Sequence, residues 1–359
     1  MRKALELSSD EQAIEGPLKG FHHETYVLPL NRPPAGEGQG RWKCREPREG
    51  LFWFDRRCFM SEEELIEALA SRVTRIPGLI KVDDIRLQRF VEGRTLGNLY
   101  AAGTAVPHRL VADLMVLFQE LSAIRPQDLP IERRCDGDKG VVDGDTEVFL
   151  QRLVRFVQED VYASHQDAFG DLFEALGVGE ESFDSLHKLV QGTQERPFSL
   201  LHADLHRENL IVDSLGKLWF IDWELAMFGD PIYDLATHLY LMRYPAKQER
   251  EVITWWRSSV ERVRPHSSRG LEEDLPKLLG YKRAQSVFTD VIRAGLRLDA
   301  VPHGHAMGSE TLARSARKVS AVLGAAAEPL GLTDVPSAQK VAGVLAGWLS
   351  GSKGQRNYL

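Results

Sequence analysis

The sequence of 359 residues has little cysteine, no excess of positive charge and no long apolar run. Its three cysteines, Cys44, Cys58 and Cys135, are scattered and never spaced as C-x-x-C. A disulfide framework or a zinc–thiolate site is therefore not expected, and a reducing compartment fits. The formal net charge of −7 gives no electrostatic footprint for nucleic acid. Since no stretch is long enough to span a membrane and no signal segment opens the sequence, we expect a cytoplasmic protein that binds neither nucleic acid nor membrane.

The sequence also lacks the G-x-x-x-x-G-K-[ST] motif, so a P-loop ATPase is not supported. What it has is the composition of an ordinary globular protein, with 43% hydrophobic and 27% charged residues. Its length allows two domains or one large one, with ample material for a core.

Strand-like segments fill the first third of the chain, and helix-like segments dominate the rest. The strand-prone runs are 16–30, 41–45, 51–59 and 85–92. Ser61 before three glutamates predicts a helix that begins there and continues to about Val73. We therefore predict an α+β, two-lobed fold, with a strand-rich lobe and its hinge in 1–95 and a mainly helical lobe in 96–359.

The most informative segment is 200–234, which contains two strand-like runs joined by a four-residue turn. A hairpin with that turn pairs Asp213 with Leu218 and therefore places Asn209 opposite Asp222. Directly opposed residues share a face, about 5 Å apart at Cβ. This register predicts an amide oxygen and a carboxylate at one spot.

Such an oxygen pair suits Mg²⁺, which prefers hard oxygen ligands and usually bridges a carboxylate to substrate phosphates. Asp204 lies just upstream, on the loop that enters the hairpin. A carboxylate near a metal-held phosphate is what a base for a substrate hydroxyl requires. The segment therefore indicates phosphoryl transfer.

These residues resemble a known family. His202-x-Asp204 followed by Asn209 is similar to the catalytic-loop pattern shared by protein kinases and the aminoglycoside phosphotransferase and choline kinase group. The run Ile221-Asp222-Trp223-Glu224 looks like that group's metal-binding aspartate motif. The run 229–236 is typical of the aminoglycoside kinase branch.

The resemblance is strong over 200–236 and weaker over the first hundred residues. It implies a kinase-like fold and a role for each matched residue. Asp204 would accept the substrate proton or orient the hydroxyl, and His202 would brace the loop. Asn209 and Asp222 would hold Mg²⁺. Asp230 and Asp234 fit caps and braces of the next helix better than substrate ligands.

In the front lobe, Lys43 resembles the strand lysine that contacts the α- and β-phosphates of ATP. Arg45 points to the same strand face and is the alternative. The acidic partner of this lysine is expected on the following helix, where Glu62 is the first choice and Glu63 the second.

The phosphate loop is expected over 19–25, where Gly20 and His23 would contact the nucleotide. This loop keeps only one glycine of a G-x-G-x-x-G pattern. The run from Phe90 to Glu92 and the following glycine resembles the hinge, where backbone groups would meet adenine.

The resemblance implies ATP and Mg²⁺ as cofactors. It also implies transfer of the γ-phosphoryl group to a hydroxyl of a small molecule, such as an antibiotic or another natural product, with a role in resistance or biosynthesis. One alternative is a kinase of Ser or Thr in a biosynthetic precursor peptide. The other is a nucleotide-binding scaffold without turnover, against which the intact Asp204, Asn209 and Asp222 argue.

Overall fold

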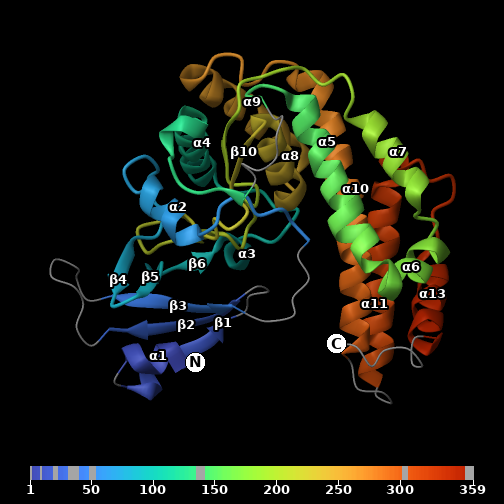
Figure 1. Ribbon diagram of the computed structural model, residues 1–359, viewed down its shortest axis with the longest axis horizontal. Coiled ribbons are helices and arrows are strands. Elements are labelled where there is room, and N and C mark those ends of the chain that lie inside the picture. The colour runs from blue at the N-terminus through green and yellow to red at the C-terminus, as the bar shows by residue number, and fades with distance from the viewer. Residues whose placement is uncertain are drawn as a thin grey trace. The chain divides into compact units, whose positions relative to one another are not determined.

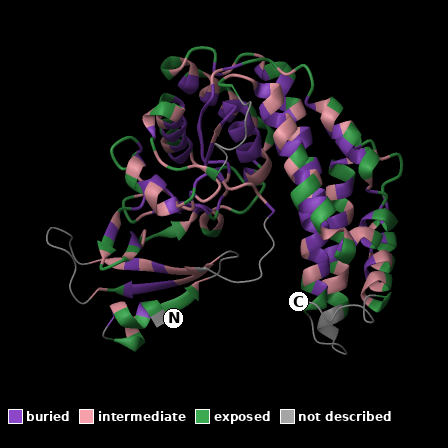
Figure 2. Cartoon of the chain, viewed as in Figure 1, coloured by how far each residue is buried: buried purple, intermediate pink, exposed green. Residues whose placement is uncertain are grey.

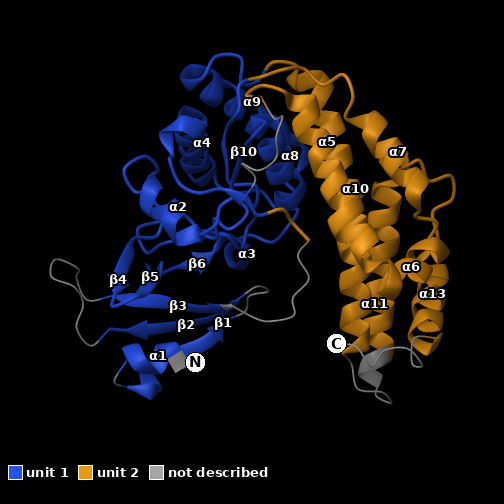
Figure 3. Ribbon diagram, in the orientation of Figure 1, with its two compact units in different colours: residues 1–52, 57–140, 197–268 blue, residues 53–56, 141–196, 269–359 orange. Residues whose placement is uncertain are grey.

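The computed structural model describes residues 2–8, 10–18, 23–30, 40–47, 54–134, 142–300 and 306–351. The chain forms two compact units (Figure 3). The first comprises residues 1–52, 57–140 and 197–268, and the second 53–56, 141–196 and 269–359. These units differ from the two lobes expected from the sequence, whose boundary near residue 95 stays a prediction.

A five-stranded antiparallel sheet in the order β1-β2-β3-β5-β4 opens the first unit (Figure 1). Its strands are β1 (Glu15–Leu18), β2 (His23–Pro29), β3 (Arg41–Pro47), β4 (Leu79–Val82) and β5 (Ile85–Arg89). Trp42 and Cys44 pack in a core with side chains of β2, β5 and helix α1 (Arg2–Leu7). Because side chains alternate along a strand, Lys43 and Arg45 lie on the opposite face of β3.

Helix α2 (Glu62–Leu69) begins where the sequence predicts. The Ser61 hydroxyl caps it by accepting the Glu64 N–H at 3.2 Å. The helix ends about one turn before the expected Val73, because the Ala70 N–H bonds to the carbonyl three residues back and the chain tightens into a turn. Val73 is nevertheless buried, which explains its place in the apolar pattern.

The segment 54–60 departs from the sequence-based expectation in two ways. Within its described residues the predicted strand is replaced by a single antiparallel bridge between Phe59 and Arg133. Cys58 is disulfide-bonded, which corrects the expectation against disulfides, and its partner lies outside the described residues. The Arg134 N–H donates to the Cys58 carbonyl at 2.7 Å, so residues 58 and 134 lie side by side. The spacing of the cysteines in the sequence could not reveal this proximity.

Two small sheets and four helices complete the described part of the first unit. One sheet joins β6 (Arg94–Thr95), β8 (Leu210–Val212) and β9 (Leu218–Phe220), and the other joins β7 (Ser199–Leu201) and β10 (Met227–Gly229). The helices are α3 (Leu96–Leu99), α4 (His108–Ala123), α8 (Pro231–Met242) and α9 (Ala246–Val263). Short 3₁₀ turns occupy Glu11–Ala13 and Pro126–Asp128. Helix α8 is buried along most of its length (Figure 2).

The β8–β9 hairpin has a register one residue away from the predicted one. Val212, rather than Asp213, pairs with Leu218. The cause is the carboxylate of Asp213, which accepts the N–H groups of Leu215 and Lys217 at 2.9 and 2.8 Å. An aspartate that bonds to the backbone ahead of it favours a turn, so Asp213 belongs to the loop and not to the strand.

The described part of the second unit is helical. Its helices are α5 (Thr146–Phe156), α6 (Gln166–Ala175), α7 (Glu180–Leu189), α10 (Leu271–Asp299), α11 (Ala306–Ala325), α12 (Ala327–Leu330) and α13 (Ala338–Gly351). A π-helical turn at Val157–Tyr162 and a 3₁₀ turn at Ala163–His165 join α5 to α6. Antiparallel strands at the front and helices after them confirm the predicted α+β class. Across the residues described, no helix combines the length and the apolar character needed to cross a membrane.

A buried ion pair joins the start of α10 to the chain before β7. Arg196 and Asp274 form it with side chains that are 0% and 1% exposed. The same carboxylate of Asp274 accepts the Gln194 N–H at 2.9 Å. Because both charges are removed from water, each needs the other to offset the cost of its desolvation.

Asp274→Ala should lower the free energy of unfolding by about 3–5 kcal/mol, because it leaves the buried Arg196 without this counter-charge. Glu310→Ala is the control, since the Arg314–Glu310 pair is exposed and is expected to contribute at most about 1 kcal/mol. Urea unfolding followed by circular dichroism measures both variants. Equal effects of the two substitutions would contradict the prediction.

Candidate active site

Buried groups hold the loop between β7 and β8, which carries Asp204. The carboxylate of Asp234 accepts the N–H groups of Ala203 at 2.8 Å and His202 at 3.2 Å. Ala203 has a φ of +61°, which non-glycine residues rarely adopt, so these bonds hold a strained backbone. Asp234 therefore acts as a brace, and Asp230 caps α8 by accepting the Ile232 N–H at 2.7 Å.

Arg207 anchors the same loop from its other end. Its side chain, 5% exposed as a residue, donates at 3.0 Å to three backbone carbonyls: those of Tyr100, Thr104 and Met242. A guanidinium has five donors in a rigid fork, so it can join several chain segments at once. The loop is thereby tied to α8 and to the segment after α3.

Asp204 and Asn209 meet directly. Asn209 Nδ2 donates to Asp204 Oδ2 at 2.9 Å and to the Asp204 carbonyl at 3.0 Å. His206 Nε2 lies 3.5 Å from the same Oδ2. Burial lowers the pKa of His206, but its hydrogen bond to Asp204 and the charge of that carboxylate outweigh burial, and the pKa is raised. The amide of Asn209 and the imidazole of His206 thus both lie against one oxygen of this carboxylate.

Asn209 and Asp222 do not oppose each other as predicted. Leu210 pairs with Phe220, and the Ile221 N–H donates to the Asn209 carbonyl at 3.1 Å. Asn209 is therefore level with Ile221. Asp222 comes one residue later with a φ of +66°, which turns the chain away from the hairpin direction. The register argument for a shared metal is wrong, although the two residues stay the predicted ligands.

Three carboxylates gather at Asp222. One oxygen from each of Glu62, Asp222 and Glu224 lies within 4.8 Å of the others. Both carboxylate oxygens of Glu62 already have partners, because Oε1 accepts the Trp223 N–H at 3.0 Å and Oε2 pairs with Arg45. Burial and the charge of Asp222 raise the pKa of Glu224 to about 7. Glu224 Oε2 also lies 2.7 Å from Arg57 Nη2, so Asp222 is the carboxylate of this group that contacts no cation among the described residues.

The predicted ion pair between Lys43 and Glu62 is replaced by one between Arg45 and Glu62. The Arg45 and Glu62 side chains are 13% and 5% exposed. Both terminal nitrogens of the Arg45 guanidinium donate to the same Glu62 oxygen, a fork that a lysine ammonium cannot reproduce. Glu63, the second choice, instead accepts the Ser61 hydroxyl at 3.0 Å.

Lys43 lies beside this pair without joining it. Its side chain makes no hydrogen bond or ion pair with the residues that the structure describes. Burial and the neighbouring Arg45 lower the pKa of Lys43, while the charges of Asp222 and Glu62 raise it, with a net decrease. Lys43 is thus a partly buried cation near these carboxylates whose donors remain available.

His23 and His202 lie near the carboxylates as uncharged groups. His23 Nδ1 is 3.8 Å from Glu224 Oε2. Burial, followed by Arg45 and Arg57, lowers the pKa of His23 to about 4. Burial likewise lowers the pKa of His202 to about 4, and its ring packs against Trp223 with centroids 4.5 Å apart. Neither imidazole is a proton donor near pH 7. Gly20 lies outside the described residues.

The predicted hinge is held by Arg41. Its guanidinium lies 4.6 Å from the centroid of the Phe90 ring and forms an ion pair of 2.6 Å with Glu92. The Phe90 N–H donates to the Arg41 carbonyl at 2.8 Å. The Glu92 side chain is therefore engaged with the sheet, and contact of this segment with adenine stays a prediction.

Sequence reasoning did not predict the contact between Arg57 and Glu224. Arg57 Nη2 lies 2.7 Å from Glu224 Oε2, with side chains 18% and 11% exposed. Glu224 closes the run Ile221-Asp222-Trp223-Glu224 that the sequence singled out, so its place beside Asp222 was a usable signal. Arg57 belongs to the segment 54–60, where a single bridge replaces the predicted strand, so its side chain could not be placed from the sequence.

The sequence profile of the phosphotransferase enzyme family (APH) matches residues 36–266. That match covers more than half of the chain, including β3, α2, the Asp204 loop and Asp222. The chain belongs to this family, which confirms the resemblance seen in the sequence.

Comparison with solved structures finds similar chains of low sequence identity. The gentamicin complex of APH(2")-IIa has 15% identity and a TM-score of 0.49, with 95% of each chain covered. Macrolide 2'-phosphotransferase MphH from Brachybacterium faecium has 13% identity and a TM-score of 0.48, with 91% of this chain and 95% of that chain covered. Choline kinase LicA from Streptococcus pneumoniae has 15% identity and a TM-score of 0.47, with 86% and 93% covered. A search of curated protein sequences finds no match.

Glu62→Ala should resemble Arg45→Ala and not Lys43→Ala. Removing either member of the buried pair leaves the other charge unpaired, at a cost of about 3–5 kcal/mol in unfolding free energy. Lys43→Ala removes no ion pair and should chiefly raise the KM for ATP, by about tenfold or more, as expected for a lost charge-assisted hydrogen bond.

Thermal unfolding and ATP kinetics on the three variants separate these effects, with the double variant Arg45→Ala/Glu62→Ala as the control for the pair. Its loss of stability should be smaller than the sum of the two single losses. If Arg45→Ala folds normally but cannot use ATP, the phosphate-binding cation is Arg45 and not Lys43.

Proposed function

We propose that the protein transfers the γ-phosphoryl group of ATP to a hydroxyl group of a small molecule. In this reaction the bond between the γ-phosphorus and the bridging oxygen of ADP breaks. A bond from the acceptor oxygen to phosphorus forms, and the acceptor proton passes to Asp204. Family membership supports phosphoryl transfer, whereas ATP, Mg²⁺ and the acceptor are parts of the proposal.

The observation that carries the proposal is the orientation of Asp204. Its side chain is 24% exposed, so an acceptor hydroxyl can reach it. Asn209 and His206 both bind Oδ2, which fixes the plane of the carboxylate. A base held in one orientation suits a reaction in which positioning supplies most of the rate.

The donor set near Asp222 fits Mg²⁺, a hard cation that prefers oxygen ligands. Asn209 and Asp222 would hold it, with Glu224 beside them. Because Asn209 donates to Asp204 through Nδ2, its amide oxygen is available as a ligand. The bound ion would neutralise negative charge on the phosphates. Lys43 supplies a further positive charge to the phosphates, and the backbone of 90–92 would meet adenine.

An ATP-consumption screen tests the proposal and identifies the acceptor. It covers aminoglycosides, nucleoside antibiotics, small amino alcohols and Ser-rich peptides, with ADP release as the readout and Asp204→Asn as the blank. ADP release with a small hydroxylated compound supports the proposal. Release with Ser-rich peptides alone favours the peptide kinase, and ATP binding without release favours the scaffold. The identity of the acceptor then distinguishes a role in antibiotic resistance from a role in biosynthesis. Cytoplasmic localisation stays a prediction.

Asp204→Asn should lower kcat by about 10²–10⁴, the usual size of a general-base effect, with little change in ATP affinity. The amide keeps the shape of the carboxylate but accepts no proton. Single-turnover kinetics and ATP titration by calorimetry provide the two readouts, with Asp84→Asn at an exposed position as the control. Normal turnover would show that Asp204 is not the base, and lost ATP binding would show that it is a ligand.

Asp222→Ala should abolish turnover and remove the Mg²⁺ dependence of ATP binding. The reason is that the other two carboxylates of the cluster are paired with arginines, Glu62 with Arg45 and Glu224 with Arg57. Calorimetry with Mg²⁺ and with a chelator measures the dependence, and Glu224→Gln should weaken it to a smaller extent. Full turnover by Asp222→Ala would overturn this metal assignment.

A further inference from the structure

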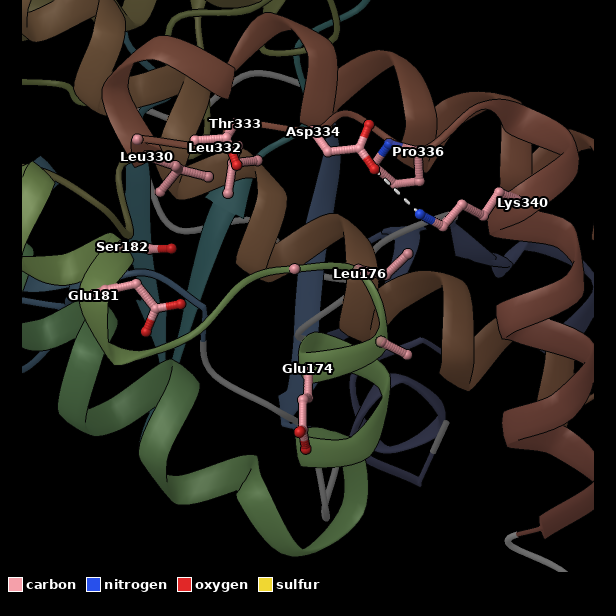
Figure 4. Close-up of a pocket in the computed structure, with 13 residues that line it drawn as sticks. Glu174, Leu176, Glu181, Ser182, Leu330, Leu332, Thr333, Asp334, Pro336 and Lys340 are labelled. Carbon is pink, nitrogen blue, oxygen red and sulfur yellow. Dashed lines mark hydrogen bonds and ion pairs between the residues drawn. The ribbon is translucent and has the colours of Figure 1, made fainter.

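The second unit contains a cavity of ≈ 520 Å³ that shares no residue with the candidate active site. Its walls come from the ends of α6 and α12, the first turn of α7, the loop before α13 and the first turn of α13 (Figure 4). A volume of this size lies within the range of about 300–1,000 Å³ typical of small-molecule sites.

The cavity has a surplus of negative charge. Glu174, Glu181 and Asp334 line it, and Lys340 is the one cation among its lining residues. Lys340 Nζ already pairs with Asp334 Oδ2 at 3.2 Å. Glu174 and Glu181 form no ion pair with the residues that the structure describes. An anionic ligand would therefore meet two uncompensated carboxylates and no available cation.

A second feature points to a ligand with hydrogen-bond donors. Ser182 is 1% exposed, and its Oγ has no hydrogen-bond partner among the described residues. In the close-up its hydroxyl is directed toward the cavity (Figure 4). Buried polar groups in native proteins are nearly always paired, so an unpaired hydroxyl at a cavity wall needs an explanation. Beside it, Leu176 and Leu330 give the cavity an apolar wall.

The spacing of the carboxylates distinguishes an organic cation from a metal ion. A metal needs several ligand atoms close together, and the only such acidic group within the described residues is Glu62, Asp222 and Glu224. Glu174, Glu181 and Asp334 do not form such a group. A cation with an extended apolar body can meet separated carboxylates and also cover the leucine wall.

We propose that this cavity binds a small aliphatic amine, of the diamine or polyamine class. Its ammonium groups pair with Glu174 and Glu181 and donate a hydrogen bond to Ser182 Oγ. Its methylene chain lies against Leu176 and Leu330. This site is independent of the proposed phosphoryl transfer.

Calorimetric titration of the full-length protein with spermidine tests the proposal. We expect saturable one-site binding, about tenfold weaker in each of Glu174→Gln and Glu181→Gln. Asp171→Asn is the matched control, because it removes an exposed carboxylate of the same helix α6 that does not line the cavity, and it should bind normally. Ser182→Ala should weaken binding while the free protein melts at the same or a higher temperature, since the substitution removes an unpaired hydroxyl.

Three further outcomes would overturn the proposal. One is unchanged spermidine affinity in the double variant Glu174→Gln/Glu181→Gln, which would place the binding elsewhere. Another is equal binding of 1,5-diaminopentane and the uncharged 1,5-pentanediol, which would remove the role of charge. The third is competition by millimolar Ca²⁺ at constant ionic strength, which would indicate a metal site.

Discussion

The candidate site depends on one buried carboxylate, that of Glu62. Through one oxygen it binds Arg45 of β3, and through the other it accepts the backbone N–H of Trp223. It thereby joins the sheet, helix α2 and the segment that carries Asp222. A buried charge is costly unless it is paired and hydrogen-bonded, and Glu62 meets both conditions only when these three parts are in place. Its placement therefore couples the position of Asp222 to that of the cation-bearing strand.

A second buried carboxylate, that of Asp234, fixes the position of the loop that carries Asp204. Asp234 accepts two successive N–H groups and so holds Ala203 at a positive φ, directly before Asp204. Strain of this kind persists only where the surrounding structure fixes it, as Arg207 and α8 do here. The proposed base and the proposed metal-binding segment are thus positioned by separate anchors, one carboxylate each, within the first unit.

The sequence predicted the fold class, the cap at Ser61 and the strand face that presents Lys43 and Arg45, because these follow from local patterns. It failed where one side chain's hydrogen bonds outweighed the pattern. The hydrogen bonds of Asp213 shift the hairpin register by one residue from the predicted one. The guanidinium of Arg45 pairs with Glu62, the residue predicted to pair with Lys43. The Arg57–Glu224 contact joins residues far apart in the chain, which no local pattern can reveal.

The charges around Asp222 support the proposal that Lys43, rather than Arg45 or Arg57, contacts the phosphates. Arg45 is matched by Glu62 and Arg57 by Glu224, so each of these cations has a carboxylate in contact. Among the described residues, the side chains of Lys43 and Asp222 form no ion pair, and the charge of Asp222 acts to raise the pKa of Lys43. A nucleotide brings phosphates to a cation and its metal to a carboxylate, so binding would satisfy both remaining groups at once. Because Arg45 and Arg57 each already contact a carboxylate, they offer less uncompensated positive charge to phosphates than Lys43 does.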